Sequence, residues 1–172
     1  IIYVTHSAYE AARLGDYIVA LDKGEVVSQG ELYDVISDPK FPRDTTREAG
    51  TVVTGTVHCI DAKWHLAQIR TGSSALITVP ANNLNPGDAV RLWIRASDIS
   101  LSHEPLKENS ISNSLPCQIE DIRHDPNPAL MIVKLRAEKI ELITRITRQS
   151  ASQLGLEPQM HIYAHIKTAA LI

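Results

Sequence analysis

Apolar and polar residues alternate along much of the chain after Thr51. The alternation is regular in residues 131–136 and again in residues 140–144. A period of two is typical of strands with one buried face and one exposed face. Turn-forming residues recur about every ten positions, as in all-β sandwiches and barrels. This part of the chain is therefore predicted to form short antiparallel strands arranged in small barrels or sandwiches.

Two stretches of this β-rich part match each other, residues 76–102 and residues 142–172. The repeat period is roughly 70 residues, which indicates two copies of one fold unit. The polar stretch 102–114 connects them. The clearest correspondences join Ile94-Arg95-Ala96 with Ile166-Lys167-Thr168, and Gly55-Thr56-Val57 with Cys117-Gln118-Ile119.

We expect five strands in each copy, which makes each an OB-like unit. A unit of this size buries little apolar surface alone, so the two copies are expected to pack together. Residues 81–84 and 150–154 are each expected to form a short helical turn. The predicted strands are 52–60, 64–70, 74–79, 89–94 and 99–101 in copy one (residues 51–102), and 116–124, 130–135, 139–146, 160–164 and 167–171 in copy two (residues 110–172).

Residues 1–44 have a different, α/β pattern. The apolar run 1–4 is typical of a strand buried in a parallel sheet, so we expect the chain to be a fragment of a longer protein that supplies this sheet. Ser7 and Glu10 form a capping box, which predicts a helix from Ala8 that Gly15 stops. A hairpin with strands at 17–21 and 25–28 and a helix at 31–37 follow, and Pro39 and Pro42 begin a linker. The predicted fold class is thus mainly β, with a short α/β remnant (1–44) before a tandem β domain (45–172).

Composition narrows the functional classes. The formal net charge is -3, so a nucleic-acid-binding surface that works by basic excess is not expected. Two cysteines are too few for a disulfide scaffold. No apolar run approaches the ~20 residues of a membrane helix. Four residues on a strand span about 13 Å, so His161 and His165 cannot share one ion, and no metal site is expected.

The N-terminal segment YVTHSAYEAARLGDYIVALDKGEVVSQGELYDVISDP resembles the last part of an ABC-transporter ATPase domain. The resemblance implies that His6 is the switch histidine, a catalytic residue whose imidazole reaches the γ-phosphate of ATP and helps to position the attacking water. The chain contains no G-x-x-x-x-G-K-[ST] loop. We therefore expect it to be inactive as an ATPase alone, with ATP and magnesium bound only by a full-length parent.

The rest of the chain resembles the TOBE/Mop-like domain at the C-terminus of molybdate-importer ATPase subunits. The similar stretches are IRASDISL, SISNSLPCQIEDI and ITRQSASQLGLEPQMHIYAHIK, together with the repeat itself. The resemblance implies an oxyanion ligand, molybdate or tungstate. Ser112 stands where the family has Arg, which removes a positive charge. The implied oxyanion-binding residues are Ser110, Ser112, Asn113, Thr147, Arg148, Ser150, Lys167 and Thr168 in copy two, and Arg95 and Ser97 in copy one.

The leading hypothesis is the C-terminal regulatory portion of an ATP-driven molybdate importer subunit, in a parent that couples ATP hydrolysis to molybdate uptake. The expected partners are a second copy of the chain and the membrane permease subunits, at the cytoplasmic face of the bacterial inner membrane. Two alternatives stay open. One is a free-standing molybdate storage or sensing protein. The other is a purely structural dimerisation domain of another ABC importer, for sugar, sulfate or iron.

Overall fold

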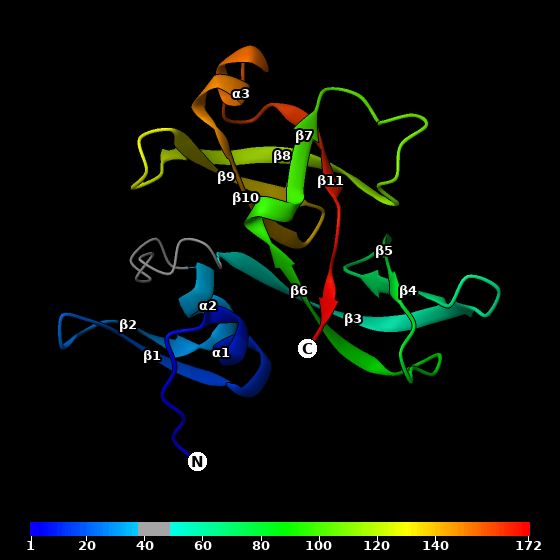
Figure 1. The fold of residues 1–172 in the computed structure, drawn as a ribbon, viewed down its shortest axis with the longest axis horizontal. Helices are drawn as coiled ribbons and strands as arrows, with labels where there is room; N and C mark the ends of the chain where they lie inside the picture. The colour runs from blue at the N-terminus through cyan, green and yellow to red at the C-terminus, as the bar shows by residue number, and fades with distance from the viewer. Residues whose placement is uncertain (38–48) are drawn as a thin grey trace.

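The computed structural model describes residues 1–37 and 49–172. The predicted domain boundary at residues 44 and 45, and the predicted linker prolines Pro39 and Pro42, lie outside the described residues. The architecture is mainly β, as predicted: a small N-terminal unit lies beside two five-stranded antiparallel sheets (Figure 1).

The N-terminal unit consists of helix α1 (Ala8–Leu14), strands β1 (Tyr17–Asp22) and β2 (Glu25–Glu31), and helix α2 (Leu32–Ser37). The predicted start and end of α1 are confirmed: the Ser7 side chain accepts a hydrogen bond from the Glu10 amide, and the Gly15 amide caps the last turn. The predicted strand at residues 1–4 is wrong. These residues lie outside regular structure, with Ile2 94% exposed and Val4 90% exposed, because no strand of the described residues pairs with them.

The two sheets each contain one long strand paired on both sides. In the first sheet the long strand is β3, and in the second it is β8. The first sheet has the order β12-β6-β3-β4-β5, and the second has the order β7-β11-β8-β9-β10. The bounds are β3 Gly50–Asp61, β4 Leu66–Thr71, β5 Ala75–Pro80, β6 Ala89–Arg95, β7 Ile99–Ser102, β8 Asn113–His124, β9 Leu130–Ala137, β10 Ile140–Thr147, β11 His161–Ile166 and β12 Ala170–Leu171.

The outermost strands β7 and β12 are exchanged between the copies. Strand β7 of copy one pairs with β11 of copy two, and β12 of copy two pairs with β6 of copy one. All ten predicted strands are present. Each sheet, however, takes four strands from its own copy and the fifth from the other copy. The exchange is reciprocal, which gives both sheets the same strand order about a pseudo-twofold relation.

The predicted correspondence between the copies agrees with the strand pairing. Thr51 pairs with Ile94 in the first sheet, and Asn113 pairs with Ile166 in the second. The long strand of each sheet also carries a bulge just after the positions that were matched, between Val57 and Cys59 in β3 and between Ile119 and Asp121 in β8.

The two predicted helical turns have different outcomes. Residues 81–84 form no helix, because Asn83 adopts a left-handed φ of 52° that a right-handed turn does not allow. The second turn is confirmed as helix α3 (Arg148–Gln153), which begins two residues earlier than predicted. Thr147 sets this start, since its side chain accepts a hydrogen bond from the Ser150 amide.

One apolar core joins the two sheets, as predicted for two copies that pack together. Its members come from both copies and are almost all aliphatic. Burial of aliphatic surface contributes about 25 cal/mol per Å² to stability. Because residues of both copies form this one core, neither copy can lose it without destabilising the other. The fully buried large residues in it include Ile69, Ile77, Leu92, Ile94, Ile119, Leu135, Leu142, Ile162 and Ile166.

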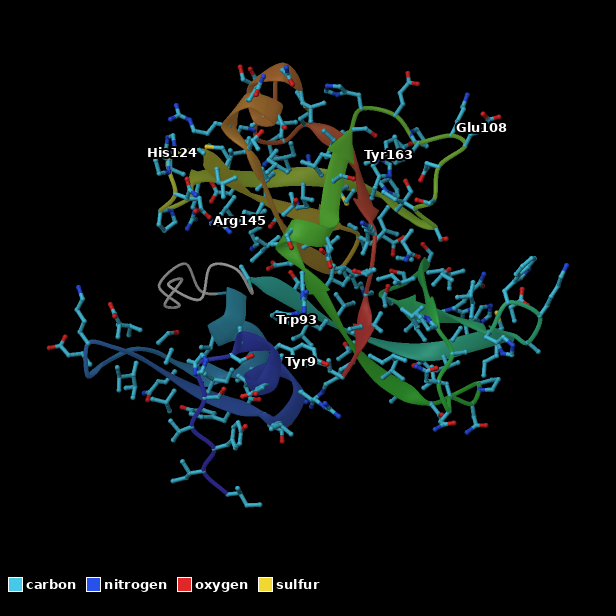
Figure 2. The ribbon with its side chains drawn as sticks, in the orientation of Figure 1. Tyr9, Trp93, Glu108, His124, Arg145 and Tyr163 are labelled. Atoms are coloured by element: carbon cyan, nitrogen blue, oxygen red, sulfur yellow. The ribbon has the colours of Figure 1, made fainter. Side chains whose placement is uncertain are left out.

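A second apolar cluster attaches the N-terminal unit to the outer face of the first sheet. Trp93 on β6 is 2% exposed and packs with Ala12 of α1 and Leu32 of α2. The Tyr9 ring meets the Trp93 ring edge-on at 6.3 Å between centroids (Figure 2). Because neighbouring residues on a strand face opposite sides, Trp93 reaches the N-terminal unit while Leu92 and Ile94 fill the core between the sheets.

Polar side chains at the start of each long strand bind the edge strand of the other sheet. The Asn113 side chain accepts a hydrogen bond from the Thr78 amide at 2.7 Å and donates one to the Thr78 carbonyl at 2.9 Å. At the matching position in copy one, the Thr51 hydroxyl accepts a hydrogen bond from the Ile143 amide at 3.2 Å. These bonds satisfy edge groups of β5 and β10 that would otherwise lack a partner strand.

Asn113→Ala removes both bonds to Thr78 at a site where Asn113 is only 5% exposed. Partly buried backbone groups left without partners are costly, so we expect the free energy of unfolding to fall by about 1–3 kcal/mol. Urea denaturation followed by circular dichroism measures this change. Asn82→Ala, at an exposed position, is the matched control, with an expected effect within about 0.5 kcal/mol. Equal effects in the two variants would contradict the assigned role of Asn113.

His165 lies within the exchanged pairing of β11 with β7. It is 1% exposed, and its Nε2 lies 2.6 Å from the Ser102 hydroxyl oxygen. Since the Ser102 hydroxyl donates to the Glu104 carbonyl, Nε2 carries the proton and donates to Ser102. The other ring nitrogen, Nδ1, is buried and has no hydrogen-bond partner among residues 1–37 and 49–172. Burial lowers the pKa of His165, because removal from water disfavours the charged form of the ring.

The lowered pKa of His165 predicts a loss of stability in mild acid. The unfolded chain takes up the proton near pH 6.5, while the folded chain resists it. The contribution of neutral His165 is therefore complete above about pH 6.5 and is lost as the pH falls from there through the folded-state pKa. Unfolding free energies measured from pH 8 to pH 5 are expected to decline less in His165→Leu than in the unaltered chain. Identical pH profiles would show that His165 is not responsible.

Candidate functional site

Several of the predicted oxyanion-binding residues meet where β8 begins and β11 ends. Asn113 pairs with Ile166, so Ser112 and Lys167 lie at the same end of this strand pair. A 3-10 turn, η2 (Ala96–Asp98), packs there as well: the Lys167 amide donates to the Asp98 carbonyl at 2.8 Å. The residues that gather at this point, called the junction cluster below, are Ser97, Asp98, Ser112, Asn113, Lys167 and Thr168.

Asp98 is the member of the junction cluster that the sequence analysis missed. The Thr168 hydroxyl donates to one carboxylate oxygen of Asp98 at 2.7 Å, and the Ser97 hydroxyl lies 3.3 Å from the other oxygen. Asp98 directly follows the Arg95-Ala96-Ser97 element, so its position in the sequence was a usable signal. Its negative charge occupies donors that an oxyanion would need, which weakens any anion site at this point.

The charged and hydroxyl-bearing side chains near the cluster are exposed to solvent. Lys167 and Arg95 are exposed, as are Ser97, Ser112 and Thr168. Asn113 is buried, and both polar atoms of its amide are bonded to Thr78. The arrangement offers a lysine and hydroxyl groups at one end of a strand pair, and these are donors of the kind that hold tetrahedral anions.

The predicted group at the start of α3 lies apart from the junction cluster. Thr144 of β10 donates to the Ile99 carbonyl just after η2, and Thr147 follows three residues later. Three strand residues span about 10 Å, so Thr147, Arg148 and Ser150 do not reach the cluster. Figure 1 shows α3 at the far end of β10.

Two of the amides at the start of α3 already have hydrogen-bond partners within the chain. The Ser150 amide donates to the Thr147 hydroxyl at 3.0 Å, and the Arg148 amide donates to the Ala129 carbonyl at 2.9 Å. Ser110, also predicted, is exposed on the connection between the copies.

His6 lies in the N-terminal unit, immediately before α1, and is exposed. The neighbouring side chains Tyr3 and Thr5 donate hydrogen bonds to the Glu10 carboxylate, which anchors this segment to the helix. None of the predicted oxyanion-binding residues belongs to this unit, which the Trp93 cluster joins to the first sheet.

Two polar contacts of the second copy were not anticipated. The Arg145 guanidinium binds both carboxylate oxygens of Asp125, at 2.8 and 2.9 Å, and Asp125 is buried. The Glu138 carboxylate accepts hydrogen bonds from Ser73 and Ser74 in the turn between β4 and β5. Each contact joins residues distant in the sequence, so no local motif indicates it.

A groove of about 710 Å³ lies near the end of the chain, between α1 and the first sheet. Arg13, Asn82, Leu84, Arg91 and Ile172 are among the residues that line it. None of the predicted oxyanion-binding residues does, so the groove is separate from the junction cluster.

Comparison with known proteins finds similarity to molybdenum import proteins. Residues 109–172 match the TOBE domain family. The whole chain is 38% identical to the molybdenum import ATP-binding protein ModC 2 of Azotobacter vinelandii and covers 48% of it. It is 36% identical over 99% of its length to ModC 1 of the same organism, covering 47% of that protein. The chain thus spans about half the length of these relatives.

A solved structure shares the fold. The chain is similar to the cytoplasmic molybdate-binding protein ModG, crystallised with molybdate bound, at a TM-score of 0.62 and 20% sequence identity. The likeness covers 71% of this chain and 93% of ModG. It agrees with the two five-stranded antiparallel sheets described above.

Within residues 1–37 and 49–172, no helix has the length and apolar character needed to cross a membrane. Over its full length the chain is similar to the C-terminal half of ModC-type molybdenum import ATP-binding proteins, and its residues 109–172 match the TOBE domain family.

Proposed function

We propose that the chain is the regulatory part of an ATP-driven molybdate importer subunit and that its paired copies bind molybdate or tungstate. The observation that carries this proposal is the match over the full chain to molybdenum import proteins. The fold shared with a protein crystallised with molybdate supports it.

The junction cluster is the proposed binding site. Lys167 supplies a positive charge, and the Ser112 and Thr168 hydroxyls supply neutral donors. Arg95, the last residue of β6, lies just before the turn that carries Ser97. Such charge-assisted and neutral hydrogen bonds together hold a tetrahedral dianion. Binding requires that the Thr168 hydroxyl turn from Asp98 to the ligand, because it now donates to that carboxylate. Thr147, Arg148 and Ser150 are proposed only as a secondary anion contact, since two of their amides are already bonded.

In a full-length parent, the N-terminal unit would be the end of an ATPase domain that binds ATP and magnesium. His6 would then approach the γ-phosphate as a catalytic residue. The exposed apolar face of β1, formed by Tyr17, Val19 and Leu21, supports a further part of the protein that covers it. The parent would pair with a second copy and with membrane permease subunits at the cytoplasmic face of the inner membrane.

One alternative function has an observation in its favour. Asp98 adds a negative charge to the junction cluster, and Ser112 stands where the family has Arg. Both features favour a structural dimerisation domain, such as that of an importer for another solute, over an anion sensor. A free-standing molybdate storage protein is the second alternative, and ligand binding without any ATPase partner would favour it.

Titration with molybdate separates ligand binding from the structural role. If the junction cluster binds molybdate, isothermal titration gives saturable heat, and ligand at 100 times its dissociation constant stabilises the fold by about 2.7 kcal/mol. Lys167→Ala is expected to weaken binding about tenfold or more, because it removes the charge at the site. Lys63→Ala, which removes an exposed lysine in the β3–β4 turn, is the matched control and should bind as the unaltered chain does. Absence of both heat and stabilisation would support the structural role instead.

A further inference from the structure

The turn between β4 and β5 holds a carboxylate from the other copy. The amides of Ser73 and Ser74 donate to Glu138 Oε2 at 3.3 and 3.1 Å, and the Ser74 hydroxyl donates to Oε1. Glu138 lies in the turn between β9 and β10, so the contact joins the equivalent hairpin turns of the two copies. The carboxylate is exposed to solvent, and this contact is therefore open to competition by ions in solution.

The geometry of the turn is that of an anion nest. Two successive backbone amides point to one oxygen, and successive amides in a turn form a concave site for anions. Gly72 just before them has a left-handed φ of 63°, and a side chain there would come within 3.6 Å of the carboxylate oxygen. The donors also hold the pKa of Glu138 below its usual range, as expected for a bound anion.

The hydrogen-bond donors of this turn suit a tetrahedral oxyanion as well as a carboxylate. They are two amides and one hydroxyl, which a tetrahedral ion can meet with three oxygens while a carboxylate has only two. The side chain of Lys139 begins beside Gly72, with its Cβ 3.9 Å from the position that a Gly72 Cβ would take. No residue of the junction cluster takes part, so this site is independent of the proposed molybdate site.

We propose that the turn formed by Gly72, Ser73 and Ser74 is an oxyanion-binding nest that Glu138 fills as a tethered ligand, and that a tetrahedral oxyanion from solution competes with Glu138 for it. Displacement of Glu138 releases the contact between the two hairpin turns. Oxyanion binding at this nest therefore loosens one link between the copies.

Glu138→Gly tests the proposal, because it removes the carboxylate at a position whose φ of 53° suits glycine. The probe is molybdate, followed through the ¹H–¹⁵N signals of the Ser73 and Ser74 amides. A tethered group acts at millimolar effective concentration, so we expect the signals of E138G to saturate at about tenfold lower molybdate than those of the unaltered chain. Glu157→Gln, which removes an exposed carboxylate in the loop before β11, should behave as the unaltered chain does.

Three outcomes overturn the proposal: no movement of these signals in E138G, equal saturation in E138G and E157Q, or movement in E138G with none in the unaltered chain at any concentration. If E138G does not fold, the side-chain carboxyl ¹³C signal of Glu138 in the unaltered chain gives a second test. Molybdate should move it toward the value of a free glutamate, and a constant signal contradicts exchange. The same titration of Lys167→Ala keeps this site separate from the junction cluster, since nest binding should persist in that variant.

Discussion

The reciprocal exchange of the short strands β7 and β12 is the constraint on which the rest of the structure depends. Each sheet has only four strands of its own copy, and its fifth comes from the other. Because the exchange crosses between sheets, the inner faces of both must close over one aliphatic core. The same arrangement places the start of each long strand against the edge of the opposite sheet, where Thr51 and Asn113 satisfy backbone groups.

The exchange also explains why the candidate ligand site lies at the joint between the copies, which is the place where η2 meets Lys167 and Thr168. The turn η2 leads into one exchanged strand, and Lys167 and Thr168 lead into the other. Asp98 and Thr168 bind each other at this crossing. An oxyanion that took the Thr168 hydroxyl from Asp98 would act directly on the joint between the copies. The first sheet is in turn attached to the N-terminal unit through Trp93, whose backbone pairs with Ala170 of the exchanged strand β12.

Local patterns in the sequence were enough to predict the strands, the repeat and helix α1. Alternation of apolar and polar residues indicates which face of a strand is buried, and the pair Ser7 and Glu10 indicates where a helix starts. Both signals are properties of residues that are close together in the sequence. The partner of a strand is not such a property, so the exchange of β7 and β12 could not be read from alternation. The apolar run at residues 1–4 shows the same limit, because apolarity does not specify what covers it.

The candidate site was predictable to a similar extent. Resemblance brought together Ser112, Lys167 and Thr168, and the structure places them at one end of a strand pair. The resemblance did not indicate that both polar atoms of the Asn113 side-chain amide are hydrogen-bonded to the Thr78 backbone, since these bonds depend on the packing of two sheets. The contact of Glu138 with Ser74 spans 64 residues, and no spacing rule connects them.

The exchanged strands constrain how such a protein can evolve by loss or duplication of a repeat. A gene shortened to one repeat would encode a four-stranded sheet with an open edge and one orphan strand. Such a product could complete itself only by trading strands with a second molecule. Loss of a repeat would thus convert a bond within one polypeptide into an obligate association of two, and duplication followed by fusion would reverse it.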